Sequence, residues 1–465
     1  MAAAGVHPGS FRDPAGFIFT HDDGAVYRQI NQAGREDFDF FISSGLYDAL
    51  VREDLIVAHN DAPKNLKLAA DAERYKVIAP TRIPFISYPY EWSFLQFKDA
   101  ALLTLRIQKI ALEHGMILKD ASAYNVQFVG KKPVFIDTLS FKKYTPGEPW
   151  EGYKQFCEHF VAPLALAHYA SYDILKLLEA NIEGVSLEFA AKLLPKRARF
   201  AHGLLSHVYL HAASKKRYEN AGSEGKAVPK RQLSKFALDG LMVSLERSIK
   251  GLRPPKQQTE WGDYYTFTNY SDKGFKEKQQ IVRDLLAQVK PKPQIVWDLG
   301  ANNGEFSVLA AEMGAYTVAF DIDPVAVGRN YAHADATGVT MLPLVQDCTN
   351  PSTANGWMGR ERDSLFARGP ADVVMALAII HHLAIGRNLP LPRIAEFLAV
   401  TGKRVIVEFV PKGDSKVDIL LSSRKDIFPD YDESHFEAAM NKHFKLAKKV
   451  PIKDTKRTMY LFETK

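Results

Sequence analysis

The fold is decided by the stretch Ile295-Val-Trp-Asp-Leu-Gly-Ala-Asn-Asn-Gly-Glu-Phe306. A buried strand here ends in an acid, a tight glycine turn follows, and a helix then begins. An α/β sheet builds a nucleotide pocket in this way, at the carboxyl end of its first strand. The stretch therefore predicts an α/β unit with a ligand site at this turn.

Two further acids stand at the ends of the next two apolar runs. Asp321 ends the run 316–320, and Asp347 follows the run 341–345. The carboxyl ends of parallel strands meet at one edge of a sheet, so these acids and Asp298 should face one ligand. An ammonium, a ribose and an adenine amino group would suit three carboxylates, and S-adenosylmethionine carries all three.

The glycine turn separates this ligand from a dinucleotide. Gly300 and Gly304 flank Ala-Asn-Asn, whereas a dinucleotide loop has a middle glycine that lets the backbone approach a pyrophosphate. S-adenosylmethionine has no pyrophosphate, and NAD has one. The alternative is an ordinary strand-turn-helix corner with solvated caps; the register of the three acids favours the ligand site.

From about Asp298 to the C-terminus the chain resembles the class I (Rossmann-like) methyltransferases. The resemblance implies that the first acid and the turn hold the methionine moiety, the second acid the ribose hydroxyls and the third acid the adenine. The positions that match the family's donor-binding residues are Asp298, Gly300, Asn302, Gly304, Asp321 and Asp347. Later runs continue the alternation of strand and helix, at 373–378, 394–400, 404–409, 433–443 and 458–462. They predict a mostly parallel sheet. The resemblance implies seven strands with an antiparallel terminal hairpin, and the last two strands, near Pro451 and Tyr460, are close enough to form it.

Candidate catalytic residues follow the fourth and fifth strands. The fourth strand leads into Ala378-Ile-Ile-His-His-Leu383, and the fifth ends in Glu408-Phe-Val-Pro411. His381 or His382 can take a proton from a hydroxyl or amine acceptor. The methyltransferase resemblance implies that Glu408 positions the acceptor. The alternative is that one ring packs under the adenine and the other caps a helix.

The C-terminal half is also similar to the methyltransferases of the nodulation-protein NoeA group. The similarity lies in the Glu408-Phe-Val-Pro411 strand followed by Phe428-Pro-Asp-Tyr431. It implies a small-molecule, glycan or glycolipid acceptor. No Asn-Pro-Pro-Tyr signature follows the fourth strand, so a nucleic-acid partner is not expected.

The N-terminal region predicts a hairpin at 16–30, two short helices at 36–42 and 47–51, and a long helix at 94–114. The sequence then continues as Leu118-Lys-Asp-Ala-Ser-Ala-Tyr-Asn125 and, after a Gly-Lys-Lys turn, Val134-Phe-Ile-Asp137. This order resembles the catalytic lobe of protein kinases and small-molecule phosphotransferases. The resemblance implies that Asp120 is a catalytic base, that Asn125 and Asp137 are Mg²⁺ ligands, and that ATP is the nucleotide.

The kinase pattern is incomplete. Leu118 and Lys119 stand where the family has His and Arg, and Thr-Leu rather than Phe-Gly follows Asp137. No glycine-rich loop precedes the first hairpin, and Arg28 replaces the lysine that holds the phosphates, which is not a conservative exchange. An active kinase-like domain, a nucleotide- or substrate-binding remnant, and a chance D-x-x-x-x-N corner are the three alternatives.

The chain has 465 residues, more than one hydrophobic core usually organises. We predict an α+β kinase-like domain at 1–213, a basic connector at 214–258 and a methyltransferase domain at 259–465.

Residues 214–257 hold eleven Lys/Arg and four Asp/Glu, an excess larger than the whole chain's net charge of +6. The segment is either a solvated connector, which we favour, or a contact for an anionic glycan, lipid headgroup or RNA. We expect 150–194 and 197–213 to be helical, and the aromatic stretch 260–270 either to cap the ligand pocket or to pack on the sheet.

Two cysteines without C-x-x-C spacing, Cys157 and Cys348, predict a reducing cytoplasmic setting. No signal-peptide pattern opens the sequence, and no apolar run is long enough to predict a membrane span. The sequence leaves the acceptor, the methylated atom and the oligomeric state undetermined.

The sequence thus predicts an S-adenosylmethionine-dependent methyltransferase with a kinase-like N-terminal domain. One alternative is a bifunctional enzyme that phosphorylates and methylates one acceptor, similar to the kinase–methyltransferases that terminate bacterial polysaccharide chains, although there the methyltransferase comes first. The other alternative is a methyltransferase with a non-catalytic module that binds a nucleotide or a partner.

Overall fold

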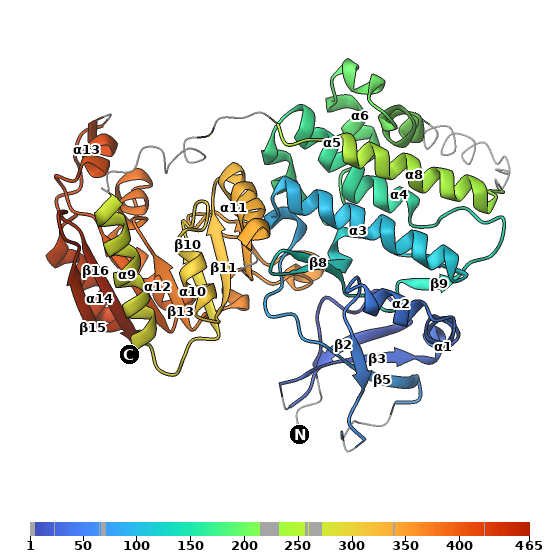
Figure 1. Cartoon of the computed structure of the whole chain (residues 1–465), viewed down its shortest axis with the longest axis horizontal. Coiled ribbons are helices and arrows are strands. Elements are labelled where there is room, and N and C mark those ends of the chain that lie inside the picture. The colour runs from blue at the N-terminus through green and yellow to red at the C-terminus, as the bar shows by residue number, and fades with distance from the viewer. Residues whose placement is uncertain are drawn as a thin grey trace. The chain divides into compact units, whose positions relative to one another are not determined.

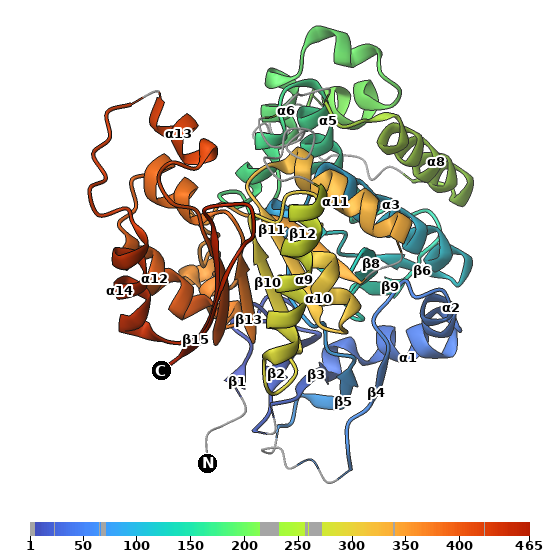
Figure 2. The same cartoon turned by 60° about the vertical axis from the view of Figure 1, so that its left-hand side comes forward.

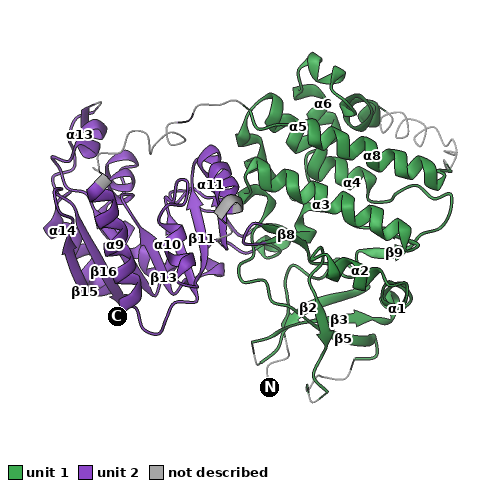
Figure 3. Ribbon diagram, viewed as in Figure 1, with its two compact units in different colours: residues 1–128, 132–256, 355–362 green, residues 129–131, 257–354, 363–465 purple. Residues whose placement is uncertain are grey.

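A computed structural model describes residues 5–22, 24–64, 66, 71–213, 232–255, 259, 272–337, 340–422 and 424–465. The chain divides into two compact units (Figure 3). Unit 1 comprises Met1–Phe128, Lys132–Lys256 and Asn355–Arg362, and unit 2 comprises Val129–Lys131, Gln257–Ala354 and Asp363–Lys465. Residues 214–231 and 256–258 of the predicted connector, and the whole aromatic stretch 260–270, lie outside the described residues.

Unit 1 begins with a five-stranded antiparallel sheet in the order β1-β2-β3-β5-β4 (Figure 1). The expected hairpin is present as β2 paired with β3, although Asp23 at its turn lies outside the described residues. Phe19, Tyr27 and Ile30 are among the buried side chains of this sheet. The strands are β1 (Gly5–Val6), β2 (Gly16–Thr20), β3 (Val26–Asn31), β4 (His59–Asp61) and β5 (Arg74–Pro80).

Helices α1 (Arg35–Ser43) and α2 (Leu46–Arg52) follow β3, as predicted, and α3 (Phe94–Glu113) follows β5. Ser93 caps α3: its side chain accepts a hydrogen bond from the Gln96 backbone N–H, and the Gln96 side chain in turn accepts from the Ser93 backbone N–H. Gly115 takes the left-handed conformation, with φ +75°, immediately after the helix. Local sequence signals therefore determine both ends of α3: the Ser93 cap at its start and Gly115 after its end.

After α3 comes the loop-and-hairpin arrangement that the kinase resemblance predicts. Strand β6 (Met116–Leu118) pairs antiparallel with β9 (Phe141–Lys143), and β7 (Val126–Val129) pairs with β8 (Lys132–Phe135). Asp120 and Asn125 lie on the loop between β6 and β7, and Asp137 follows β8. Unit 1 is thus an α+β unit in which a loop and a hairpin follow the long helix α3.

The expected helical run at 150–194 is interrupted, and the expectation of a helix throughout was wrong. It consists of α4 (Tyr153–Phe156), a π-helical segment, α5 (Ala162–Tyr169), a 3-10 segment and α6 (Leu187–Leu193). Ser171 has an extended backbone. Gly184 has φ +87°, and a Cβ there would lie 2.7 Å from the Glu158 carbonyl oxygen, so both its conformation and its surroundings favour glycine. Part of the range predicted as connector forms α8 (Lys235–Gly251), whose buried residues include Leu238 and Leu245.

Unit 2 is built on a seven-stranded sheet in the order β12-β11-β10-β13-β14-β16-β15. The first five strands are parallel, and β16 runs antiparallel between β14 and β15. The strands are β10 (Ile295–Leu299), β11 (Tyr316–Asp321), β12 (Met341–Val345), β13 (Val373–Ala376), β14 (Arg404–Phe409), β15 (Phe444–Pro451) and β16 (Thr458–Thr464). This confirms the Rossmann-like methyltransferase fold and its antiparallel terminal hairpin.

Helices cover both faces of this sheet (Figure 2). Helices α9 and α10 lie on one face, and α12 and α14 pack together on the other. After β10 the chain adds β11 and β12 along one edge direction of the sheet. It then adds β13 and β14 on the opposite side of β10, so the strand order reverses at β10. Ligands bind at such a reversal, outside the carboxyl ends of the strands. The helices of unit 2 are α9 (Asp272–Gln288), α10 (Ser307–Glu312), α11 (Pro324–Thr337), α12 (Leu391–Thr401), α13 (Ser415–Ser422) and α14 (Glu433–His443).

One hydrophobic core joins α9 and α10 to the sheet. It includes Val282 and Leu285 of α9, Val296 of β10 and Ile406 of β14, all of them buried. In the part of the chain that the structure describes, no helix is both long and apolar enough to cross a membrane.

Replacing Ile406 with alanine should lower the free energy of unfolding by about 2–5 kcal/mol, because the side chain has no exposed surface and leaves a cavity. Ile419→Ala is the matched control: Ile419 is 62% exposed on α13, and we expect a change within about 0.5 kcal/mol. Urea unfolding of the full chain, followed by tryptophan fluorescence, measures both. Equal effects of the two substitutions would contradict this core.

Candidate functional site

A cavity of about 350 Å³ lies at the carboxyl ends of β10, β11, β12 and β13. Its wall includes the acids that end the first and second strands and the one that follows the third, as the sequence predicts. It also includes residues of α9, α13 and the turn after β13. The polar and charged residues on its wall are Lys278, Asp298, Asn302, Asp321, Gln346, Asp347, Cys348, Thr349, His382 and Arg387.

The turn after β10 needs both of its glycines. Gly300 has φ +72° and Gly304 has φ +87°, conformations that side chains other than glycine rarely adopt. A Cβ on Gly304 would lie 2.5 Å from Oδ1 of Asn330, and one on Gly300 would lie 3.1 Å from Ile379. The turn therefore lets the backbone line the cavity closely, as the sequence motif implies.

Asp298 is the deepest acid of the site. Its carboxylate is buried and accepts a 2.6 Å hydrogen bond from the Ser307 hydroxyl at the start of α10. Burial raises the pKa of Asp298 to about 7, even though the Ser307 hydrogen bond and the positive charge of Lys278 oppose the rise. An ammonium ligand beside this carboxylate would favour its charged form.

Asp321 is held by the backbone. One carboxylate oxygen accepts from the Asn302 N–H at 2.8 Å, and the other accepts from the Asp323 N–H at 2.9 Å. Burial raises the pKa of Asp321 to about 6, and these two N–H donors oppose the rise. The contact from Asn302 ties the glycine turn to the end of β11.

Among the described residues, Thr349 anchors Asp347 through one carboxylate oxygen. Its Oδ1 accepts from the backbone N–H of Thr349 at 2.8 Å and from the Thr349 hydroxyl at 2.6 Å. The three predicted acids, Gly300 and Asn302 thus line one cavity, whereas Gly304 of the same turn is not on its wall. Their donor-binding roles remain predictions.

The two histidines after β13 have different surroundings. His382 lines the cavity, and burial together with the positive charges of Lys416 and Arg457 lowers its pKa to about 4. It is therefore neutral at pH 7 and can accept a proton. His381 is not among the lining residues; its ring lies 4.1 Å from that of His382, and burial holds its pKa well below the usual value.

Glu408 lies behind the cavity rather than on its wall. It has no exposed surface, and its two oxygens pair with Lys278 at 2.5 Å and Arg457 at 3.0 Å. Lys278, on α9, is the member of this group that lines the cavity, and sequence reasoning missed it. The sequence feature that could have indicated Lys278 is its place on the apolar face of the helix, between Phe275 and Val282.

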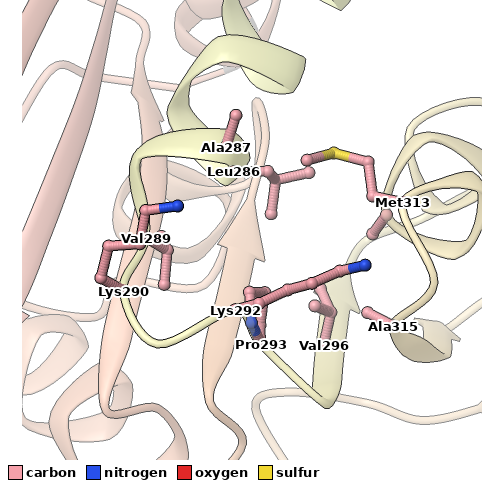
Figure 4. Close-up of a pocket in the computed structure, with 10 residues that line it drawn as sticks. Leu286, Ala287, Val289, Lys290, Lys292, Pro293, Val296, Met313 and Ala315 are labelled. Carbon is pink, nitrogen blue, oxygen red and sulfur yellow. The ribbon is translucent and has the colours of Figure 1, made fainter.

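A second, smaller cavity of about 200 Å³ lies near the amino end of β10 (Figure 4). Apolar side chains dominate its wall, with Leu286 and Val289 from the α9 side and Met313 and Ala315 on the other. None of the predicted site residues lines it. It lies at the end of the strands opposite to the ligand crevice of this fold.

The kinase-like residues of unit 1 are also brought together. The Asn125 amide donates to Ser140 Oγ at 3.1 Å, and the Ser140 hydroxyl donates to Asp137 at 2.5 Å. Asp120 accepts the Ser122 N–H at 2.8 Å and hydrogen-bonds Asn125, and burial raises its pKa. The D-x-x-x-x-N spacing therefore places these residues in one cluster.

Arg28 pairs with Asp137, the carboxylate that the kinase resemblance predicts to bind a metal ion. Its guanidinium forms an ion pair and a hydrogen bond with the Asp137 carboxylate. Burial would raise the pKa of Asp137, but Arg28, Ser140 and the Leu139 N–H together hold it below the usual value. Among the residues that the structure describes, no group of three or more His, Cys, Asp or Glu is arranged to hold a metal ion. As arranged here, the cluster does not fit Mg²⁺ with ATP.

Comparison with known proteins places the chain in a family. It is 37% identical over 480 residues to the nodulation protein NoeA of Rhizobium meliloti (strain 1021), with 100% of this chain and 98% of that protein covered. The chain belongs to the NoeA family. The similarity to the NoeA group seen in the 408–411 and 428–431 stretches is thereby confirmed, whereas no protein-family model matches this NoeA-family chain.

Solved structures match parts of the NoeA-family chain. WbdD is 18% identical, with 42% of this chain and 40% of WbdD covered, less than half of that protein, at a TM-score of 0.31. Magnesium protoporphyrin IX methyltransferase (ChlM) from Synechocystis PCC 6803 with bound SAH is 18% identical, with 44% and 93% covered, at 0.31. N-methyltransferase NodS from Bradyrhizobium japonicum WM9 is 10% identical, with 42% and 98% covered, at 0.32. With TM-scores this low, the fold assignment rests on the strand order of unit 2.

The raised pKa of Asp298 predicts a pH-dependent stability difference between the wild type and Asp298→Asn. Between pH 3.8, the ordinary pKa, and about 7, the folded carboxyl keeps a proton that the unfolded chain loses. The free energy of unfolding of the wild type therefore falls as pH rises through this range. The Asp298→Asn variant has no carboxyl at this position, so this contribution to the fall is absent. The free energy of unfolding of Asp298→Asn minus that of the wild type should rise from pH 4 to 7 and then level off. A difference that stays constant across this range in urea titrations would contradict the assignment.

Proposed function

We propose that this NoeA-family protein is an S-adenosylmethionine-dependent methyltransferase acting on a small-molecule, glycan or glycolipid acceptor. One observation carries the proposal: three carboxylates from three successive parallel strands line one cavity beside a glycine turn. We retain 259–465 as the methyltransferase domain, 1–213 as the kinase-like domain and 214–258 as the segment between them.

The cavity residues suit this methyl donor group by group. Asp298 would hold the ammonium, with the Gly300–Gly304 turn against the methionine moiety. Asp321 keeps acceptor capacity for ribose hydroxyls beyond its backbone donors, and Asp347 keeps an oxygen for the adenine amino group. A pyrophosphate would instead meet three carboxylates, so NAD fits poorly.

When bound, the donor supplies a methyl group already activated on a sulfonium, so the protein's task is mainly alignment and exclusion of water. We propose that His382, which is neutral at pH 7, accepts a proton from the acceptor; its pKa of about 4 makes it a weak base, so this role suits an acceptor that ionises readily. We propose that His381 supports its ring from behind, and that Glu408 acts through Lys278 rather than on the acceptor.

The wall after β13 suits an acceptor that is neutral or anionic. Leu383, His382 and Arg387 line this part of the cavity together with Leu420 of α13, whereas Asp298, Asp321 and Asp347 all lie on the donor side. A hydroxyl or carboxylate oxygen is therefore a better methyl acceptor here than a protonated amine.

For unit 1, the structure favours a non-catalytic module over a kinase. Phosphate transfer would require Mg²⁺ on Asn125 and Asp137 with Asp120 as the base, and Arg28 is paired with Asp137 instead. The bifunctional kinase–methyltransferase, the activity that WbdD's description names for that protein, remains the second candidate for this chain.

Labelled methyl transfer tests the main proposal. Full-length protein with methyl-labelled S-adenosylmethionine and a cell extract should yield a labelled product that mass spectrometry can identify. Asp321→Ala should weaken donor binding about 10- to 100-fold, since it removes charge-assisted hydrogen bonds of about 1.5–3 kcal/mol. Asp284→Ala, an exposed carboxylate on α9, should leave binding and transfer unchanged. Donor binding that is insensitive to Asp321 would overturn the proposed site.

The Arg28–Asp137 pair makes a separate prediction for unit 1. Arg28→Ala should destabilise the protein by about 3–5 kcal/mol, because it leaves a largely buried carboxylate without its partner. Arg106→Ala breaks an exposed pair with Glu53 and should cost about 1 kcal/mol or less. Thermal unfolding of the wild type should not change on adding Mg²⁺, with or without ATP. A clear rise in melting temperature with Mg²⁺ and ATP together would contradict this reading of the Arg28–Asp137 pair. Turnover of the bound ATP would then support the kinase alternative, and binding without turnover would support a nucleotide-binding module.

A further inference from the structure

One buried ammonium group reaches the wall of the donor cavity. Lys278 comes from α9, the helix that precedes the first strand, and is 4% exposed. Its Nζ lies 4.5 Å from the centre of the Phe306 ring, a second residue of the cavity wall. A lysine at such a place is desolvated without being excluded from the ligand space.

Lys278 belongs to a series of alternating charges within unit 2, and it is the member that lines the cavity. Glu408 of β14 pairs with Lys278 through one oxygen and with Arg457 through the other. Arg457 also donates to both oxygens of Asp414, at 2.7 and 3.1 Å. Two cations and two carboxylates alternate, so the series is neutral by itself and its geometry is fixed by a forked guanidinium.

Asp298 adds a further carboxylate to the same wall. Its negative charge acts on Lys278 and opposes the lowering of the lysine's pKa by burial, and the charge of Lys278 acts in return on Asp298. The cavity wall thus presents one cation and one anion. A zwitterion, with an ammonium and a carboxylate on one carbon, complements such a pair.

Burying an ion pair seldom increases stability relative to apolar side chains of similar size. Structure alone therefore gives little reason for a lysine on the apolar face of α9. A ligand carboxylate gives such a reason, because it would meet a preorganised cation in a site of low dielectric.

We propose that Lys278 binds the carboxylate of the methyl donor's amino-acid end, while Asp298 takes its ammonium. Glu408, itself fixed by Arg457, is a positioning residue that aims the Lys278 ammonium into the cavity. The inference rests on the proposed function and assigns a residue that lies outside the glycine-turn motif.

Two ligands that differ by one group test the assignment. Decarboxylated S-adenosylmethionine keeps the adenosine, the sulfonium and the ammonium but lacks the carboxylate. Calorimetry on the wild-type full chain should show S-adenosylmethionine binding at least about tenfold more tightly, as expected for a charge-assisted contact. This comparison needs no variant, so it does not depend on how a substitution folds.

Lys278→Met should remove that preference, because the contact with the carboxylate, worth about 1.4 kcal/mol, is lost. The affinity for the decarboxylated ligand should stay within about threefold of wild type, because that ligand has no carboxylate to make the contact. Lys276→Met, an exposed lysine on the same helix, is the control and should keep the preference. Lys278→Arg should keep most of it, because the charge is retained.

Equal wild-type affinities for the two ligands, or equal weakening of both by Lys278→Met, would overturn the role of Lys278 and leave the methyltransferase proposal standing. Failure of the wild type to bind either ligand would overturn the methyltransferase proposal, and this inference with it.

Discussion

Burial of two carboxylates at the carboxyl edge of a parallel sheet is the constraint on which the rest of unit 2 depends. Burial raises the pKa of Asp298 and of Asp321, so each needs donors close by to stay charged. The Ser307 hydroxyl supplies one, and the Asn302 backbone N–H supplies another. Both donors depend on the turn that Gly300 and Gly304 allow. The same arrangement leaves unused acceptor capacity facing the cavity, which a cationic and hydroxyl-bearing ligand can satisfy.

The sequence predicted this edge well because its determinants are local. A strand that ends in an acid, a glycine turn and a helix start are readable within twelve residues, and the parallel sheet brings successive strand ends together. The strand order and the terminal hairpin followed for the same reason. The helical run at 150–194 was predicted less well, because its breaks depend on close tertiary contacts such as that of Gly184 with Glu158.

The sequence did not predict which side chains pair when the two partners lie far apart in the chain. Glu408 has a plausible place at a strand end, but its burial and its pairing with Lys278 and Arg457 arise only when α9, β14 and the segment before β16 meet. Arg28 and Asp137 stand 109 positions apart, and the sequence alone could not show that the arginine pairs with the acid rather than with a phosphate. In both cases the residue type was visible and its partner was not.

The most direct measurement is a crystal structure of the full-length protein with S-adenosylhomocysteine. The account predicts the molecule in the cavity at the carboxyl ends of β10 to β13, with its ribose on Asp321, its adenine beside Asp347 and its amino-acid end between Asp298 and Lys278. Electron density for the molecule at another place, or an empty cavity at saturating ligand, would contradict the account.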